Sequence, residues 1–165
     1  MNTLDTTLFP VKEVPACMVD SKGQVDHVDR TGYKFIIRED TGQVLSCMTN
    51  NYKLVKNEDI YKVANKVVKK HNGVAKEIRS FSGGSKSIMR WHFPDHVVNI
   101  GNKDLIHPEV TIKNSYDGTI GVNVIAGAFR LVCSNGAVIG VVIEKYKNKH
   151  IMSNIALENI EQVIT

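Results

Sequence analysis

One amphipathic stretch, residues 57–70, constrains the possible fold more than any other part of the chain. Its apolar residues recur at the spacing that places them on one face of an α-helix, and this is the strongest helical signal in the sequence. They are Ile60, Val63, Ala64, Val67 and Val68. Asn57 fits the N-cap position, and Gly73 fits the helix end. A helix with one apolar face needs a second layer to cover that face, so the rest of the chain must supply one.

That second layer is predicted to be a β-sheet. Most of the remaining segments are rich in β-branched and aromatic residues and are separated by turn residues. Two hairpins are expected, one on either side of the helix. They join residues 33–38 to 43–48 and residues 74–82 to 86–93. A third short strand is expected at residues 52–55, directly before the helix.

The C-terminal half continues this pattern. Residues 110–116 alternate apolar with polar side chains, and residues 119–125 resume the alternation after Asp117-Gly118, a pair typical of a type I′ turn. Weaker signals predict a short strand at 97–100, buried strands or a buried helix at 129–133 and 137–143, and a capped helix at 153–164. We therefore expect this half to add hairpins to the sheet.

The summed pattern is α+β, a curved antiparallel sheet of hairpins with one or two packed helices. The chain has 165 residues, of which 42% are apolar, and this suits one domain with a buried core. We place that single α+β domain at residues 31–165. Residues 1–30 contain Pro10 and Pro15 and are predicted to form an extended N-terminal lead-in, with one edge strand at residues 16–19.

Cysteine usage and the lengths of apolar runs bear on the cellular setting. Cys17, Cys47 and Cys133 are odd in number and far apart, so they form neither a disulfide framework nor a CxxC metal motif. No apolar run approaches the roughly 18–20 residues of a membrane span, and the N-terminus lacks the features of a secretory signal. We therefore expect a cytoplasmic protein with no membrane association and no cofactor.

Basic residues cluster on the predicted helix and on the hairpin that follows it, although the net charge of +4 is mild. The candidates for contact with nucleic acid are Lys62, Lys66, Lys69, Lys70, Arg79, Lys86, Arg90 and Trp91. Lysine and arginine neutralise phosphates while an exposed aromatic ring stacks on bases, which is how many proteins hold single strands. The alternative is a solvated helix face with a tryptophan in the core, and Glu58, Asp59 and Glu77 dilute the positive charge.

A histidine-rich segment holds the candidates for a metal site. His92, Asp95, His96 and His107 could bring imidazoles and a carboxylate together. Their spacing matches neither an H-E-x-x-H helix nor a Cys/His finger, and Pro94 breaks any helix there. We therefore predict no metal site and keep these residues as the weak candidates.

A polar cluster at residues 114–117 contains residue types that are found in catalytic sites. Ser115 would need a histidine base, and the only histidine within ten residues is His107, in a predicted loop. The sequence also lacks the G-x-S-x-G pattern of a nucleophile elbow. We interpret the cluster as a strand end followed by a tight turn.

Residues 82–87, Ser-Gly-Gly-Ser-Lys-Ser, invite comparison with a phosphate-binding loop. A Walker loop requires spaced glycines between a strand and a helix, whereas these glycines are adjacent and a strand is predicted to follow. We interpret the segment as a mobile hairpin tip that presents Lys86.

Four short motifs occur in a recognisable order along the chain. They are Ile37-Arg-Glu-Asp-Thr-Gly-Gln-Val-Leu45, Asn51-Tyr-Lys-Leu-Val-Lys-Asn-Glu58, Asn114-Ser-Tyr-Asp-Gly118 and Phe129-Arg-Leu-Val-Cys-Ser-Asn135. On these motifs the chain resembles the phage/plasmid-like protein family, domain of unknown function number 932, over residues 14–150. The resemblance implies a phage, plasmid or prophage setting in a bacterial cell, and it implies no catalytic residues. The predicted architecture is also similar to that of the single-strand annealing proteins of phages.

These observations lead to three hypotheses. The first is a non-enzymatic protein of a mobile element that binds or anneals single-stranded DNA in replication or recombination, as a homo-oligomer. The second is an adaptor or inhibitor that docks on a host or phage enzyme through the Gly83-Gly84 tip or an open sheet edge. The third is a metal-dependent enzyme that uses the histidine-rich segment.

Overall fold

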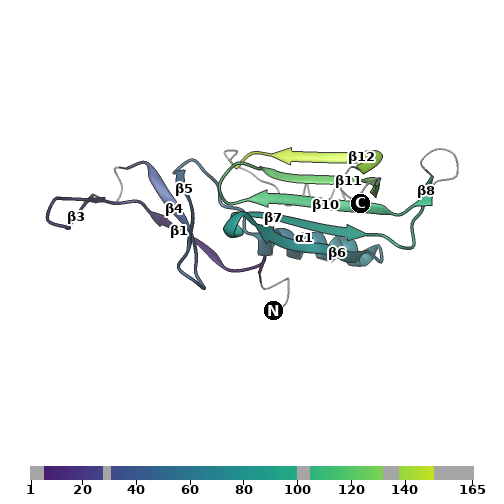
Figure 1. The fold of residues 1–165 in the computed structure, drawn as a ribbon, viewed down its shortest axis with the longest axis horizontal. Helices are drawn as coiled ribbons and strands as arrows, with labels where there is room; N and C mark the ends of the chain where they lie inside the picture. Colours follow the sequence, from purple (N-terminus) through teal and green to yellow (C-terminus); the bar gives the residue numbers. More distant parts are fainter. Residues whose placement is uncertain (1–5, 28–30, 100–104, 132–137, 151–165) are drawn as a thin grey trace.

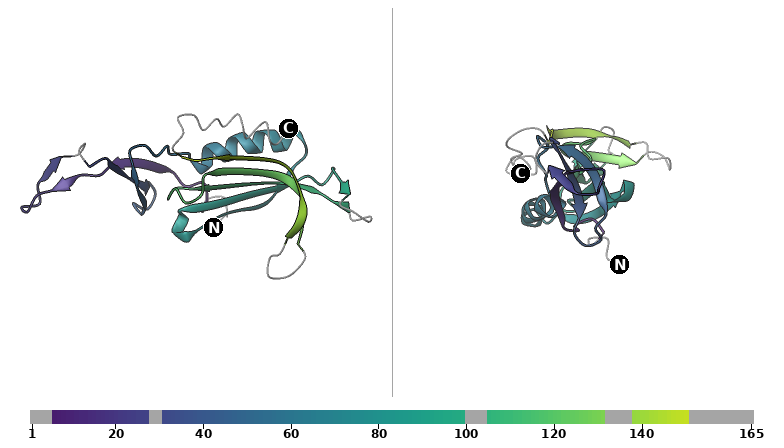
Figure 2. Two further views of the ribbon diagram at one scale, coloured as in Figure 1. Left: turned by 90° about the horizontal axis from the view of Figure 1, so that it is seen from above. Right: turned by 90° about the vertical axis from the view of Figure 1, so that its left-hand side faces the viewer.

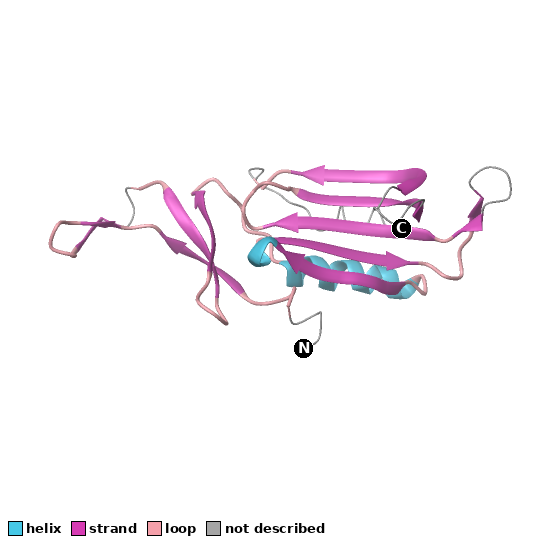
Figure 3. Cartoon of the chain, in the orientation of Figure 1, coloured by secondary structure: helices cyan, strands magenta, loops and turns pink. Residues whose placement is uncertain are grey.

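The computed structural model describes residues 6–27, 31–99, 105–131 and 138–150. The described residues form antiparallel sheets and one α-helix, which confirms the predicted single α+β domain. The molecule is elongated, and its largest sheet carries the helix on one side (Figure 1). Figure 3 shows that strands dominate the architecture.

The first sheet has three strands in the order β1-β4-β5, formed by Val11–Pro15, Tyr33–Arg38 and Val44–Thr49. The last two strands are the predicted first hairpin, paired from Tyr33 opposite Thr49. Strand β1 pairs with β4 along its whole length, so this part of the predicted lead-in belongs to a sheet.

A two-stranded ribbon projects beyond the first sheet at one end of the molecule (Figure 1). It consists of β2 (Met18–Val19) and β3 (Val25–His27). The predicted edge strand at residues 16–19 is thus shorter than expected. Asp20 organises the turn of the ribbon, because its Oδ1 accepts hydrogen bonds from the backbone N–H groups of Lys22 and Gln24, both at 2.8 Å.

The largest sheet has five antiparallel strands in the order β12-β11-β10-β7-β6. In chain order they are β6 (Val74–Phe81), β7 (Lys86–His92), β10 (Pro108–Ser115), β11 (Val122–Leu131) and β12 (Val138–Asn148). The sheet is curved, most visibly along β11 and β12 (Figure 2). The predicted hairpin at residues 74–93 is confirmed, with a 3₁₀ turn, η1 (Ser82–Gly84), at its tip. A short ribbon of β8 (Val98–Asn99) and β9 (Leu105–Ile106) connects β7 to β10.

Several predictions of local structure differ from what the structure shows. Residues 52–55 do not form a strand; Tyr52 is buried there and donates a hydrogen bond to the carbonyl of Ser115. The apolar stretches at 129–133 and 137–143 belong to strands as far as they are described, but Val142 and Ile143 are exposed rather than buried. The helix predicted at 153–164 lies outside the described residues.

The helix α1 (Asn57–Lys70) follows the predicted range, with acidic residues in its first turn and basic residues in its last. The N-cap position is Lys56, and no side chain caps this end, so the prediction for Asn57 is wrong. After the helix, the Gly73 N–H donates to the carbonyl of Val68 at 2.9 Å. A Cβ at Gly73 would lie 2.4 Å from a Val68 methyl, so only glycine fits this close approach.

The loop between β10 and β11 is not the predicted type I′ turn. That turn requires positive φ at both central residues, but only Gly118, at 70°, has it and Asp117 does not. Instead the Asp117 carboxylate accepts hydrogen bonds from the N–H and hydroxyl of Thr119. The hydroxyl of Ser115 donates to the carbonyl of Ile120 at 2.7 Å. The hairpin itself is confirmed by the pairing of β10 with β11.

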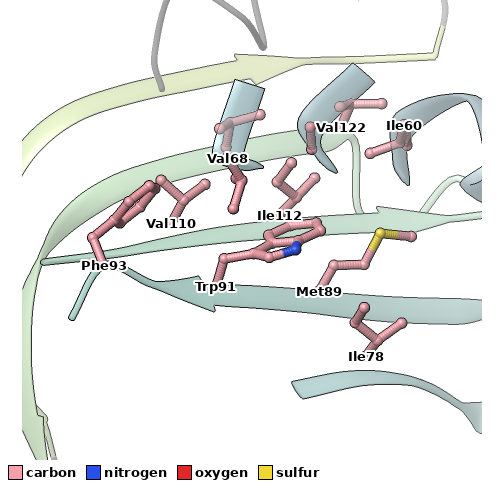
Figure 4. Close-up of a cluster of buried hydrophobic side chains, with 11 residues drawn as sticks. Ile60, Val68, Ile78, Met89, Trp91, Phe93, Val110, Ile112 and Val122 are labelled. Atoms are coloured by element: carbon pink, nitrogen blue, oxygen red, sulfur yellow. The ribbon is translucent and has the colours of Figure 1, made fainter. Parts of the chain in front are cut away.

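The main core lies between α1 and the five-stranded sheet (Figure 4). Trp91 is its largest side chain and has no exposed surface. The other buried members are Ile60, Ala64, Val68, Ile78, Met89, Phe93, Val110, Ile112, Val122 and Val124. A second cluster of Phe9, Val11, Ile36, Tyr52 and Tyr116 joins the first sheet to the end of β10. Within the described residues, no helix has the length and apolar composition needed to cross a membrane.

Candidate nucleic-acid interface

The strand register divides the side chains of the five-stranded sheet between two faces. Met89 lies opposite Ile112, and Trp91 lies opposite Val110; all four belong to the core under α1. Because successive strand residues point to opposite sides, Arg90 and its register partners lie on the other face. We call it the open face, since α1 covers only one side of the sheet (Figure 2). It includes Glu77, Arg79, Phe81, Lys86, Ile88, Arg90, His92, Glu109, Thr111, Lys113, Asn123, Ile125, Lys145 and Lys147.

The three cations predicted on the hairpin, Arg79, Lys86 and Arg90, all belong to the open face. Each of them has an acidic partner. Glu77 pairs with both arginines, its Oε2 lying 3.1 Å from Nη1 of Arg90, and Lys86 Nζ lies 3.7 Å from Oδ2 of Asp117. These pairs are partly exposed and therefore contribute little to stability, but they reduce the positive potential of this part of the face.

Asp117, the acidic partner of Lys86, is held in its charged form. Burial raises the pKa of Asp117, but hydrogen bonds from Thr119 and the charge of Lys86 outweigh it, so the pKa of this carboxyl lies below its usual value. Lys86 therefore faces a carboxylate at neutral pH. A polyanion that bound here would compete with this carboxylate for the lysine.

The lysines predicted on the helix lie on the other side of the molecule. Lys62, Lys66, Lys69 and Lys70 are exposed on α1, whose opposite side packs against the covered face of the sheet. Lys62 also pairs with Glu58 at 2.7 Å. The sequence predicted one basic surface from helix and hairpin together, but the sheet separates the two groups.

Trp91 is the clearest correction to the predicted site. Its side chain is fully buried, and its ring stacks against that of Tyr61 with centroids 6.1 Å apart. The expectation of an exposed ring that stacks on bases is therefore wrong, and the alternative of a core tryptophan is right. The aromatic residue on the open face of this hairpin is Phe81, which is half-buried and has the guanidinium of Arg79 5.5 Å from its ring centroid.

Three further lysines, which the sequence patterns did not single out, belong to the open face. Lys113 of β10 lies opposite Asn123 of β11, and Asn123 lies opposite Lys147 of β12. Lys145 lies opposite Ile125 in the next row of the same face. A signal was present in the sequence, because lysines at positions 145 and 147 have the period of a strand and must share one of its faces.

These three lysines differ from the hairpin cations in having no ion-pair partner among the described residues. Lys145 and Lys147 are exposed, and Lys113 is half-buried. Between the charged side chains, Ile88 and Thr111 are buried, at 5% and 8% exposed. The accessible part of the open face is therefore formed mainly by its long charged residues, and its unpaired charge is positive.

The metal candidates do not come together. His92 belongs to the open face, whereas His96 lies with its ring edge against Phe93 of the covered core. Asp95 and His107 are exposed, and Nδ1 of His107 lies 2.8 Å from the carbonyl oxygen of His96. In the part of the chain that the structure describes, no three His, Cys, Asp or Glu side chains are placed to hold a metal ion.

The polar cluster at residues 114–117 is mainly buried and structural. Asn114 Nδ2 donates to the carbonyl of Val55 and to Oδ1 of Asn57, and the Tyr116 hydroxyl accepts the Asn57 N–H at 2.9 Å. Burial raises the pKa of Tyr116 to about 12, so this hydroxyl stays protonated. Asn57 thus joins the helix start to β10, which explains why its side chain does not cap the helix. No histidine base reaches Ser115, whose hydroxyl is bonded within the loop.

The glycine tip of the hairpin is not free. Gly84 and Ser85 are buried, and a Cβ at Gly84 would lie 3.2 Å from the Phe9 ring. Gln43, in the loop between β4 and β5, donates to the Gly83 carbonyl at 3.1 Å. The tip therefore links the large sheet to the small one, while Ser82 and Gly83 remain exposed. Docking of a partner at this tip stays a prediction.

Comparison with models of protein families identifies the family of this chain. The model of a family described as "Domain of unknown function (DUF932)" matches residues 44–162, which is most of the chain. The chain therefore belongs to this family. Neither the curated proteins nor the solved structures contain a match.

Proposed function

We propose that this member of the DUF932 family is a non-enzymatic protein of a mobile genetic element that binds single-stranded nucleic acid through the open face. The setting in a phage or plasmid follows from the resemblance of its sequence motifs. A role in replication or recombination, with assembly into homo-oligomers, is part of the same proposal. Sheet surfaces that carry cations, usually together with aromatic side chains on which bases stack, are common platforms for single strands.

The observation that supports this proposal best is the position of Lys113. Lysines on an edge strand such as β12 are common in proteins, because they prevent pairing with other chains. Lys113 lies in β10, the central strand of the sheet, where it has strands on both sides and needs no such protection. A lysine in the middle of this face, with no ion-pair partner among the described residues, is better explained by an anionic ligand than by edge protection.

Two triple variants with the same change in charge test the proposal. K113Q/K145Q/K147Q removes the unpaired cations of the open face, whereas K62Q/K66Q/K69Q removes three cations from the helix. We expect the first variant to weaken binding of a fluorescein-labelled thymidine oligonucleotide, measured by anisotropy. Its salt slope should also fall, because each lysine that neutralises a phosphate of a single strand contributes about 0.7 to the slope.

The helix variant is expected to bind like the natural protein. The proposal fails if the natural protein does not bind the oligonucleotide at low salt or if its affinity does not depend on the salt concentration. It also fails if both variants lose affinity equally. Light scattering with and without the oligonucleotide tests the assembly. A mass that remains that of one chain under both conditions contradicts the oligomer.

A second candidate function, a protein–protein adaptor, rests on the β2–β3 ribbon. Met18, Val19 and Val25 are 57–59% exposed there. Because an isolated two-stranded ribbon is barely stable in water, a partner that covers these side chains would stabilise it. A pull-down from nuclease-treated host lysate tests this candidate. A specific partner should be lost with M18S/V25S and retained with K113Q/K145Q/K147Q.

A further inference from the structure

The charges of the open face are arranged in rows that cross the strands. Lys147, Asn123, Lys113, Ile88 and Arg79 are successive register neighbours from β12 to β6. We call this set the cross-strand row. Neighbouring strands lie about 4.8 Å apart, so the row extends for roughly 19 Å, with a cation about every 10 Å.

No residue of the cross-strand row carries a carboxylate, although Glu77 of the next row pairs with Arg79 at its end. The next row contains Glu77, opposite Arg90, and the one after it contains Glu109, opposite His92. Glu109 also pairs with Lys76. The adjacent row also holds Arg90 and Lys145, but its carboxylate makes it less favourable for a chain of phosphates than the cross-strand row. Lys113 and Lys147 of the cross-strand row have no acidic partner among the described residues.

Among the described residues, the open face offers little for a base to stack on, because its aromatic rings are those of Phe81 and His92 and both are half-buried. Of the aromatic side chains that the structure describes, Trp91 is buried, and Tyr146 packs against the covered core. Phe81 is half-buried beside Arg79. The residues of the cross-strand row are instead three long cations, an amide and the buried Ile88, and the cations can contact phosphates without stacking on bases.

We propose that the ligand is held by its sugar–phosphate backbone along the cross-strand row, with no contribution from base stacking. This inference rests on the proposed function and specifies it. Recognition would then be independent of base sequence, and affinity would follow the number of phosphates that the row neutralises.

An abasic strand separates this inference from the proposed function. We compare two fluorescein-labelled phosphodiester strands of equal length, one of thymidine and one of tetrahydrofuran abasic units, at the same salt concentration. The expected result is binding of the two strands within about threefold, because stacking would otherwise contribute about 1–3 kcal/mol per base. Tight binding of thymidine with a loss of about tenfold or more for the abasic strand overturns the inference and leaves the proposed function standing. Binding of neither strand overturns both.

Variants that each remove one charge test whether the sugar–phosphate backbone follows the cross-strand row. K147Q and R79Q change the two ends of the cross-strand row, and K113Q changes its centre. K145Q changes a lysine of the open face on β12 outside the row, and K66Q on the helix is the matched control that is expected to bind like the natural protein. Each variant in the row is expected to weaken binding of both strands and to reduce the salt slope by about 0.7, whereas K145Q has a smaller effect. If K145Q and K147Q weaken binding equally and R79Q does not, the strand follows the edge β12 and the route proposed here is wrong. Melting temperatures equal to that of the natural protein show that each variant is folded.

Discussion

The two faces of the five-stranded sheet are formed by the same strands but differ in burial, polarity and charge. On the covered face, Met89 and Trp91 pack with Ile112 under α1, and they leave essentially no surface exposed. On the open face, the alternate residues of these strands include Arg90 and Lys113, and α1, the one helix of four residues or more among the described residues, lies on the other side of the sheet. One residue of shift along a strand separates a core position from a surface position.

Stability and candidate function therefore depend on different faces of the sheet in this protein. Burial of large apolar side chains stabilises the covered face, whereas the ion pairs of the open face are exposed enough to contribute little. The open face can therefore change its charge at small cost to folding. Measurements of the free energy of unfolding for variants of neighbouring residues test whether the two faces differ in this way.

The largest effect is expected at Trp91. Trp91→Ala removes the biggest buried side chain and leaves a cavity under α1, so the free energy of unfolding should fall by about 3–5 kcal/mol. Urea denaturation followed by circular dichroism measures this. The neighbouring Arg90→Ala on the open face should cost about 1 kcal/mol or less, because it removes a partly exposed ion pair. Equal losses for the two variants would contradict the assignment of the faces.

A smaller effect is expected for two asparagines that lie on opposite faces. Asn114→Ala removes buried hydrogen bonds to Val55 and Asn57 and should lower the free energy of unfolding by about 1–3 kcal/mol. Asn123→Ala on the open face should cost less, since Oδ1 of Asn123 has no hydrogen-bond partner among the described residues. The same urea titrations compare them, and a larger loss at Asn123 would show that the open face is held together by its polar groups.

The mildest effect is a pH dependence at His150, where the end of β12 meets the segment before the helix. Its ring stacks on Tyr52 with centroids 4.8 Å apart, and Nδ1 lies 2.9 Å from the carbonyl oxygen of Lys53. Burial lowers the pKa of His150, against smaller opposing effects of the carbonyls of Lys53 and Ile120. The unfolded chain therefore binds a proton more readily, and stability should be complete above the unfolded pKa of about 6.5 and should fall as the pH drops below it.

Thermal melts between about pH 7.5 and 5.5, on either side of the unfolded pKa, measure this dependence. In His150→Gln, which cannot take up the proton, the decline should be shallower. A decline of the same steepness in both proteins would assign it to other groups. The open-face variant K113Q/K145Q/K147Q is a useful comparison, because it should keep the steepness of the natural protein.

Local patterns predicted the elements well where they were long and regular. The spacing of Ile60, Ala64 and Val68 predicted the helix and its buried side, and the hairpins at 33–48 and 74–93 were expected from their strand-like segments. The incorrect predictions concern residues whose conformation depends on tertiary contacts. Asn57 has the side chain of an N-cap, but its amide is drawn into the buried network with Asn114, and Tyr52 anchors its segment by its side chain rather than by strand pairing.

The candidate site was predicted only in part. Arg79, Lys86 and Arg90 are on one face as expected, but their acidic partners Glu77 and Asp117 could not be assigned without the register. Lys113 and Lys147 are 34 positions apart in the sequence, and only the pairing of β10 through β11 to β12 puts them in one row. The period-two spacing of Lys145 and Lys147 was the one local signal that could have indicated this face.

Residue type and local periodicity are enough to specify the layers, namely one amphipathic helix, several hairpins and an excess of positive charge, because these features depend on a few neighbouring positions. Only the tertiary structure decided which side of the sheet the helix covers. That choice buried Trp91, separated Lys62 and its neighbours from Arg79, and left Lys113 on the uncovered side. The physical reason is that strand residues alternate between two faces, and which face becomes core depends on contacts between segments far apart in the chain.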